Sequence, residues 1–233
     1  MGQNVDLIAS DGHRLSAYSA LPGSAPRGAI VVIQEIFGVT RHIRAVADQY
    51  AAAGFNAIAP ALFDRVEHGI DVPYTDMAKG FGYMQALKNE NVMLDVQAAI
   101  DRVAGTGKVG VVGYCWGGYL AYLTAVRHKP DAAVGYYGVG IDKKLDLAKN
   151  LSCPLMLHYA ELDQYASPEV AAQVRATYKG DPRVTVYEYP QVGHAFARPG
   201  GRHFNARASD LADMRTLSFL VETIIGHNKV GIL

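Results

Sequence analysis

The chain contains only two cysteines, too few for a disulfide framework. It also has no excess of charge, because 22 Lys and Arg residues balance 22 Asp and Glu residues, which argues against binding to nucleic acid or to an anionic membrane. No apolar run approaches the roughly 20 residues of a membrane-spanning helix. The first residues lack the basic and apolar regions of a signal peptide. We therefore expect a protein of a reducing compartment, the cytoplasm, that contacts neither nucleic acid nor membrane.

The amino-acid composition is typical of a globular protein with a sizeable core, since 50% of the residues are apolar and 19% are charged. A length of 233 residues fits one α/β domain. The sequence shows no internal repeat, low-complexity segment or linker. We expect a single domain over residues 1–233.

Apolar, strand-like runs alternate with segments of helical periodicity along the chain. The Asp11-Gly12 pair lies between two strand-like runs and predicts an opening hairpin. Further strands are expected at residues 29–33, 56–59, 109–112, 132–137, 155–159 and 184–188, and helices at residues 41–53, 74–103, 117–128, 168–179 and 208–225. Gly54 is expected to end the first of these helices, and residues 60–72 to form a loop. The alternation predicts a mostly parallel sheet with helices on both faces.

A nucleophile elbow is indicated by Gly113-Tyr-Cys-Trp-Gly117, which has the pattern glycine-x-nucleophile-x-glycine with Cys115 at its centre. A valine-rich strand precedes it and a helix-compatible run follows. Such an abrupt turn leaves no room for Cβ atoms at the flanking positions, which explains the glycines. The N–H groups and the dipole at the start of the helix favour a thiolate and an oxyanion. Cys115 is therefore the candidate nucleophile.

A nucleophilic thiol needs a base, and the base needs an orienting carboxylate. His194 lies in a glycine-containing loop after a strand, near the end of the chain, where the order nucleophile, acid, base puts the base. Asp163 follows the strand at residues 155–159 and is the expected acid. Glu161 stays open as the alternative acid, and Asp181 is interpreted as a turn residue.

No histidine stands at metal-ligand spacing from another histidine or a cysteine, so no metal is predicted. The segment Gly105-Thr-Gly-Lys108 lacks the spacing of a phosphate-binding loop and is interpreted as a turn. Cys153 is interpreted as a small core residue.

Four segments together resemble the dienelactone hydrolase (carboxymethylenebutenolidase) family over essentially the whole chain. They are Gln34-Glu-Ile-Phe-Gly38, Val112-Gly-Tyr-Cys-Trp-Gly-Gly118, Gly135-Tyr-Tyr-Gly138 and Gly193-His-Ala-Phe-Ala-Arg198. The resemblance implies an α/β-hydrolase fold of three layers with a mostly parallel central sheet. It implies hydrolysis of a small-molecule lactone or ester without a cofactor, through Cys115, His194 and Asp163. The expected assembly is a monomer or a weak homodimer.

The resemblance also implies roles for residues beside the nucleophile. Glu35 would hold the resting thiol neutral and accept its proton when substrate arrives, because a nearby carboxylate disfavours a thiolate. The backbone N–H groups of Ile36 and Trp116 are the expected oxyanion donors. Arg198 and Phe37 are expected to contact the substrate.

The chain departs from the family pattern at two places. Residues 73–81 correspond to a helical insert in which the enzymes that act on dienelactone carry an arginine, but only Lys79 offers a positive charge here. An anionic substrate is therefore expected to bind modestly and in a salt-sensitive way through Arg198 and Lys79, and Arg65 is the first candidate for any further cation. Ala160 replaces a glycine common before the acid loop.

Two interpretations from other classes stay open. A redox-responsive or stress-related protein could carry a reactive cysteine on the same elbow without turnover. A binding module with an inactive site is the second.

Overall fold

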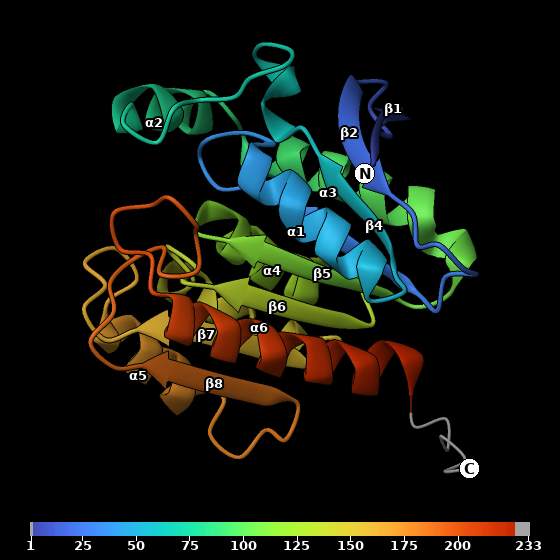
Figure 1. Ribbon diagram of the computed structural model, residues 1–233. Coiled ribbons are helices and arrows are strands. Elements are labelled where there is room, and N and C mark those ends of the chain that lie inside the picture. Colours follow the sequence, from blue (N-terminus) through green and yellow to red (C-terminus); the bar gives the residue numbers. More distant parts are fainter. Residues whose placement is uncertain (1, 227–233) are drawn as a thin grey trace.

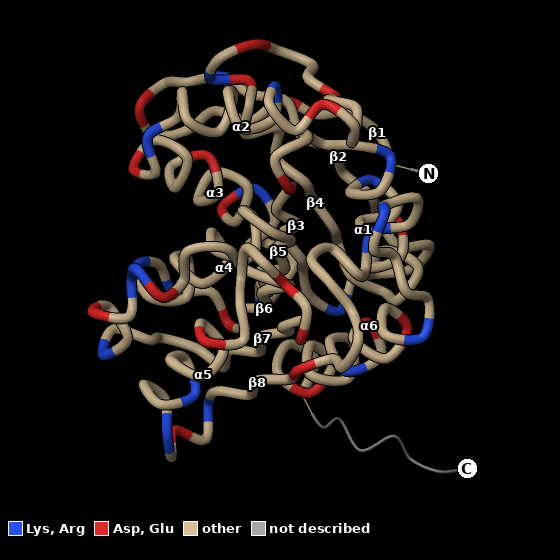
Figure 2. The backbone as a smooth tube through the Cα atoms, turned by 90° about the vertical axis from the view of Figure 1, so that its left-hand side faces the viewer, with Lys and Arg blue, Asp and Glu red and all other residues tan. Residues whose placement is uncertain are grey.

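A single sheet with the strand order β1-β2-β4-β3-β5-β6-β7-β8 forms the centre of the computed structural model, which describes residues 2–226. β1 pairs antiparallel with β2 and β2 with β4, whereas the remaining pairs are parallel. Figure 2 looks at the sheet from the carboxyl ends of its parallel strands and shows the strands following one another in this order. The strands are Gln3–Ile8 (β1), Arg14–Ala20 (β2), Ala29–Ile33 (β3), Asn56–Pro60 (β4), Val109–Tyr114 (β5), Ala132–Tyr136 (β6), Leu155–Ala160 (β7) and Val184–Tyr189 (β8).

Helices cover both faces of the sheet, which makes three layers (Figures 1 and 2). α1 and α6 pack on one face, α3, α4 and α5 on the other, and α2 lies apart at the end where the parallel strands finish. Their bounds are Arg41–Ala52 (α1), Met77–Gln85 (α2), Asn89–Val103 (α3), Trp116–Arg127 (α4), Pro168–Thr177 (α5) and Ala206–Leu220 (α6). Among the described residues, no helix has the length and apolar character needed to cross a membrane.

The central strands are apolar without polar alternation because both of their faces are covered. All five residues of β3 are buried. Val31 and Ile33 face the core beneath α3 and α4, whereas Ile30 and Val32 face the core beneath α1 and α6. This two-sided burial holds the carboxyl ends of the parallel strands together at one edge.

The predicted fold class is confirmed, and so is the opening hairpin, in which Ile8 pairs with Arg14. Gly54 ends α1 as expected. It has a φ of 94°, its N–H bonds to the carbonyl of Ala51, and the N–H of Phe55 bonds to the carbonyl of Tyr50. This is the hydrogen-bond pattern of a glycine C-cap.

The prediction of one helical segment over residues 74–103 is wrong, because the chain breaks between α2 and α3. Lys88, immediately before α3, is extended, with φ −91° and ψ 132°. The two helices are therefore buried to different extents. α3 packs Val92 and Val96 into the core, whereas Gly80 is the one buried residue of α2. Short turns at Leu62–Arg65 and Asp142–Asn150 were also not predicted.

Candidate active site

Cys115 occupies a sharp turn between β5 and α4. Its φ of 56° lies in the left-handed region that non-glycine residues rarely adopt. A Cβ at Gly113 would lie 1.9 Å from the carbonyl oxygen of Gly117, and a Cβ at Gly117 would lie 2.4 Å from that of Ile33. Both flanking glycines are thus sterically required. The turn projects the Cys115 thiol at the N-terminus of α4.

Three side chains predicted from the sequence lie in a hydrogen-bonded row. His194 Nε2 is 3.1 Å from Cys115 Sγ, and His194 Nδ1 is 2.7 Å from Asp163 Oδ2. The other oxygen of Asp163 accepts hydrogen bonds from the backbone N–H groups of Tyr165 and Ala166, at 2.8 and 3.0 Å. These bonds fix the carboxylate, which in turn orients the imidazole ring.

Glu161, the alternative acid, lies elsewhere in the same loop system. Its carboxylate accepts a hydrogen bond of 2.7 Å from the backbone N–H of Gln191. It therefore supports the turn before His194 and makes no hydrogen bond to the imidazole among the described residues. Asp181 bonds to Arg183 in the turn before β8, as expected of a turn residue.

The electrostatic surroundings of His194 favour its charged form. Burial disfavours the imidazolium, but the Cys115 sulfur and the Asp163 carboxylate outweigh this effect and raise the pKa of His194 to about 10. The rings of Tyr137 and Tyr165 lie edge-on to the imidazole, with centroids 5.1 and 5.0 Å away. A charged imidazole is the partner that a thiolate needs.

The loop after β3 brings Ile36 beside the elbow, since Ile33 pairs with Gly113 in the neighbouring strand. Both Ile36 and Trp116 line the cavity that contains Cys115. Their backbone N–H groups donate no hydrogen bond to another group within residues 2–226. Free N–H groups of this kind can bind a developing negative charge.

Gln34 and Gly80 hold this loop in place. The Gln34 amide donates to the carbonyl of Glu35 at 3.3 Å and accepts the N–H of Leu62 at 3.1 Å. A Cβ at Gly80 would lie 2.5 Å from the carbonyl oxygen of Ile36, so α2 touches the loop backbone directly.

Glu35 forms an ion pair with Arg198 at the same edge of the sheet. The carboxylate is 1% exposed and both of its oxygens lie 3.3 Å from Arg198 Nη1. The guanidinium lies over the rings of Tyr74 and Phe37, with its central carbon 4.5 and 5.0 Å from their centroids. Arg198 Nε is buried and has no hydrogen-bond partner among the described residues. Arg198 also lines the cavity that contains Cys115.

These residues line a cavity of about 940 Å³. Its walls come from the loop after β3, from α2 and α4, and from the loops after β6, β7 and β8. Cys115, His194, Phe37 and Arg198 belong to the lining. Lys79 does not, and its ammonium instead lies 6.0 Å from the ring centroid of Tyr83.

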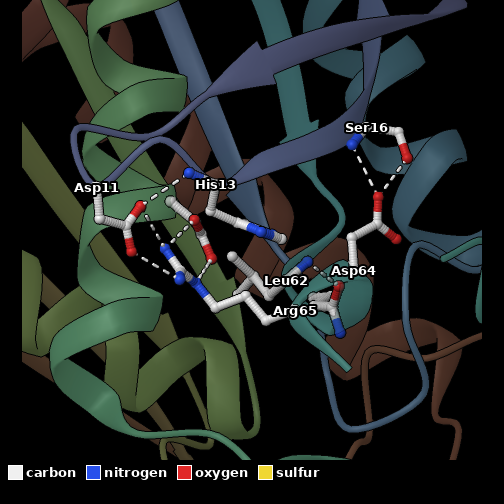
Figure 3. Close-up of polar contacts among 8 residues, drawn as sticks. Asp11, His13, Ser16, Leu62, Asp64 and Arg65 are labelled. Carbon is white, nitrogen blue, oxygen red and sulfur yellow. Dashed lines mark hydrogen bonds and ion pairs between the residues drawn. The ribbon is translucent and has the colours of Figure 1, made fainter. Parts of the chain in front are cut away.

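Cations that the sequence did not single out line the cavity instead, namely Lys143, Lys144 and Arg202. Arg65 is absent from the lining. As Figure 3 shows, its guanidinium is held by Asp11 of the opening hairpin, and it also binds Asp95 of α3. These two carboxylates hold the Arg65 side chain outside the cavity lining.

Within residues 2–226, no group of three or more His, Cys, Asp or Glu side chains could hold a metal ion. Cys153 is buried, which raises the pKa of its thiol to about 12 and makes it a poor nucleophile.

The chain is similar in sequence and in fold to known hydrolases. The model of the dienelactone hydrolase family matches residues 15–224. A carboxymethylenebutenolidase of Pseudomonas putida is 33% identical, with 94% of this chain and 95% of that protein covered. Carboxymethylenebutenolidase 1 of Cupriavidus pinatubonensis is 32% identical, with 94% and 97% covered. A crystal structure of a dienelactone hydrolase-like promiscuous phosphotriesterase from metagenomic libraries matches with a TM-score of 0.80 at 21% identity, covering 96% of this chain and 99% of the other, and shows the shared fold.

Proposed function

The chain belongs to the dienelactone hydrolase family, and from that premise we propose that it opens lactone and ester bonds with Cys115 as the nucleophile. Membership makes the protein a hydrolase of lactone or ester bonds. What we add is the assignment of the steps to particular groups of this chain.

One observation carries the proposal: His194 lies within hydrogen-bonding distance of both the Cys115 sulfur and the Asp163 carboxylate, at 3.1 and 2.7 Å. A base that contacts its nucleophile and its orienting acid at once is the arrangement that nucleophilic catalysis needs. The fold brings these groups together from three separate loops.

The reaction then proceeds in two halves. The Cys115 thiolate attacks the carbonyl carbon, and the N–H groups of Ile36 and Trp116 stabilise the oxyanion, each contributing roughly 3–4 kcal/mol in comparable sites. The alkoxide or enolate leaves with a proton from His194, and a thioester remains. Water, deprotonated by the now neutral His194, attacks the thioester and releases the acid, and the Cys115 sulfur leaves as a thiolate that takes back the proton held by Glu35. Side chains and water supply every proton, so no step needs a cofactor.

Glu35 and Arg198 link this chemistry to the charge of the substrate. The buried Glu35 carboxylate forms an ion pair with Arg198, whose Nη1 atom lies 3.3 Å from each carboxylate oxygen. A substrate carboxylate that binds Arg198 would compete for the guanidinium and weaken its hold on Glu35. The freed carboxylate could then take the thiol proton, which starts the reaction only when substrate is bound.

The second cysteine provides a matched test. We expect Cys115→Ala to abolish hydrolysis of activated esters and lactones without a large change in melting temperature, because the thiol lines the cavity and is only partly buried. Cys153→Ala should keep wild-type turnover, since Cys153 lies in the core outside the cavity lining. Residual hydrolysis by Cys115→Ala above a tenth of wild type would refute the assignment of the nucleophile.

A further inference from the structure

An apolar stripe on α2 packs against the edge of the protein core and also faces the cavity. Met77, Phe81 and Met84 recur at helical spacing, and all three line the cavity and are only partly buried. Gly80 alone among the α2 residues is fully buried. The apolar face of α2 is therefore covered by protein only in part, and the uncovered part looks into the active-site cavity.

α4 and the start of α3 also contribute to the cavity lining. Tyr119 lies one turn beyond Cys115, and its N–H bonds to the Cys115 carbonyl at 3.2 Å. Asn89 donates a hydrogen bond of 3.1 Å to the Tyr119 hydroxyl. The cavity thus continues from the thiol along α4, between aromatic and thioether side chains. We call the part lined by Met77, Phe81, Met84 and Tyr119 the apolar arm.

The size of the cavity exceeds what a compact lactone needs. Carboxymethylenebutenolide has about ten non-hydrogen atoms, which at roughly 30 Å³ each, the volume of a liquid water molecule, occupy about 300 Å³. The cavity measures about 940 Å³. A small carboxylated lactone held at Arg198 would leave the apolar arm to water, and water beside thioether and aromatic side chains is readily displaced by an apolar group.

We propose that the apolar arm binds an extended apolar group of the substrate, such as an alkyl chain or an aryl ring, carried on the ester or lactone that Cys115 attacks. The substrate class is therefore an ester or lactone larger and more apolar than carboxymethylenebutenolide. This inference rests on the proposed function.

Two ester series test the inference, because the apolar group could lie on either side of the scissile bond. One series lengthens the acyl side from p-nitrophenyl acetate to butanoate and hexanoate. The other lengthens the alcohol side from 4-methylphenyl to 4-butylphenyl and 4-hexylphenyl acetate. In at least one series, kcat/KM should rise at least tenfold from the shortest to the longest ester, since each buried methylene contributes about three- to fourfold.

Met84→Glu places a carboxylate in the apolar arm and should reduce that rise to less than threefold. Gln85→Glu adds the same charge at the next, exposed residue of α2 and should preserve the wild-type ratio. Met84→Leu, which keeps the arm apolar, should preserve it too and controls for loss of folding.

Each result separates the inference from the proposed function. Flat or falling kcat/KM in both series, with ester hydrolysis still dependent on Cys115, would overturn the inference alone. A rise of equal size in wild type and Met84→Glu would mean that the apolar group of the ester binds outside the apolar arm, and it would also overturn the inference. Failure to hydrolyse any ester, or hydrolysis that persists in Cys115→Ala, would overturn the proposed function and with it the inference.

Discussion

Gly80→Ala should damage catalysis although the substituted residue touches no reacting atom. Alanine is about 1 kcal/mol more favourable than glycine inside a helix, so propensity alone predicts a more stable α2. The added Cβ, however, would lie 2.5 Å from the carbonyl oxygen of Ile36, and ordinary contact begins at 3.4 Å. Either α2 or the loop carrying the proposed oxyanion donor must therefore move by about 0.9 Å.

The size of the effect follows from that displacement. A misplacement of about 1 Å can cost on the order of 100-fold in rate, and the loss of one oxyanion donor costs about 100- to 1000-fold. We expect kcat of Gly80→Ala to fall by about 10- to 100-fold, with little change in KM.

Gly82→Ala is the matched control, because it lies on the same helix and its Cβ would meet nothing within 4 Å. It should keep kcat within twofold and raise the melting temperature by about 2–4 °C. The assay is steady-state hydrolysis of p-nitrophenyl acetate with thermal unfolding of both variants. Equal kcat in the two variants would refute the reasoning, and a rise confined to KM would show that α2 moves and Ile36 does not.

Two further predictions concern the charged groups of the site. His194→Ala should lower kcat about 100- to 10,000-fold, and Asp163→Asn should lower it less. The double variant should be little worse than His194→Ala, because the two residues act as one unit. Losses that multiply in the double variant, measured by steady-state kinetics, would contradict this. Arg198→Ala should raise KM for an anionic lactone at least tenfold more than for a neutral ester of similar shape, since a charged hydrogen bond contributes about 1.5–3 kcal/mol when it is shielded from water. Equal changes in both KM values would mean that Arg198 serves only Glu35.

The strength expected for Arg198 shows where the sequence was insufficient. The segment Gly193–Arg198 identified Arg198 from the sequence alone. An arginine exposed on the surface binds anions weakly and with a strong dependence on salt, which is why the sequence predicts modest binding. In the structure its side chain is 13% exposed and its guanidinium lies over the rings of Tyr74 and Phe37. Tyr74 enters this site from a loop more than 100 residues away in the chain, and no local pattern indicates that contact.

The row Cys115–His194–Asp163 was predictable because each member follows from local rules. A glycine-flanked residue between strand and helix must project its side chain, and loops at the carboxyl ends of parallel strands must meet. The placement of Lys79 and Arg65 outside the cavity lining could not be predicted, because their surroundings depend on long-range packing. The opening hairpin, for example, supplies the Asp11 carboxylate that binds Arg65.

Trapping the covalent intermediate tests the central claim most directly. His194→Ala, which should form the thioester slowly and hydrolyse it more slowly still, is mixed with excess p-nitrophenyl acetate, quenched in acid, and digested for peptide mass spectrometry. We predict one acetyl group on Cys115, formed in wild type only as a short-lived species and lost on incubation with hydroxylamine. An acetyl group on another residue, or a Cys115 that is oxidised but never acylated under conditions in which wild type turns over, would contradict the account.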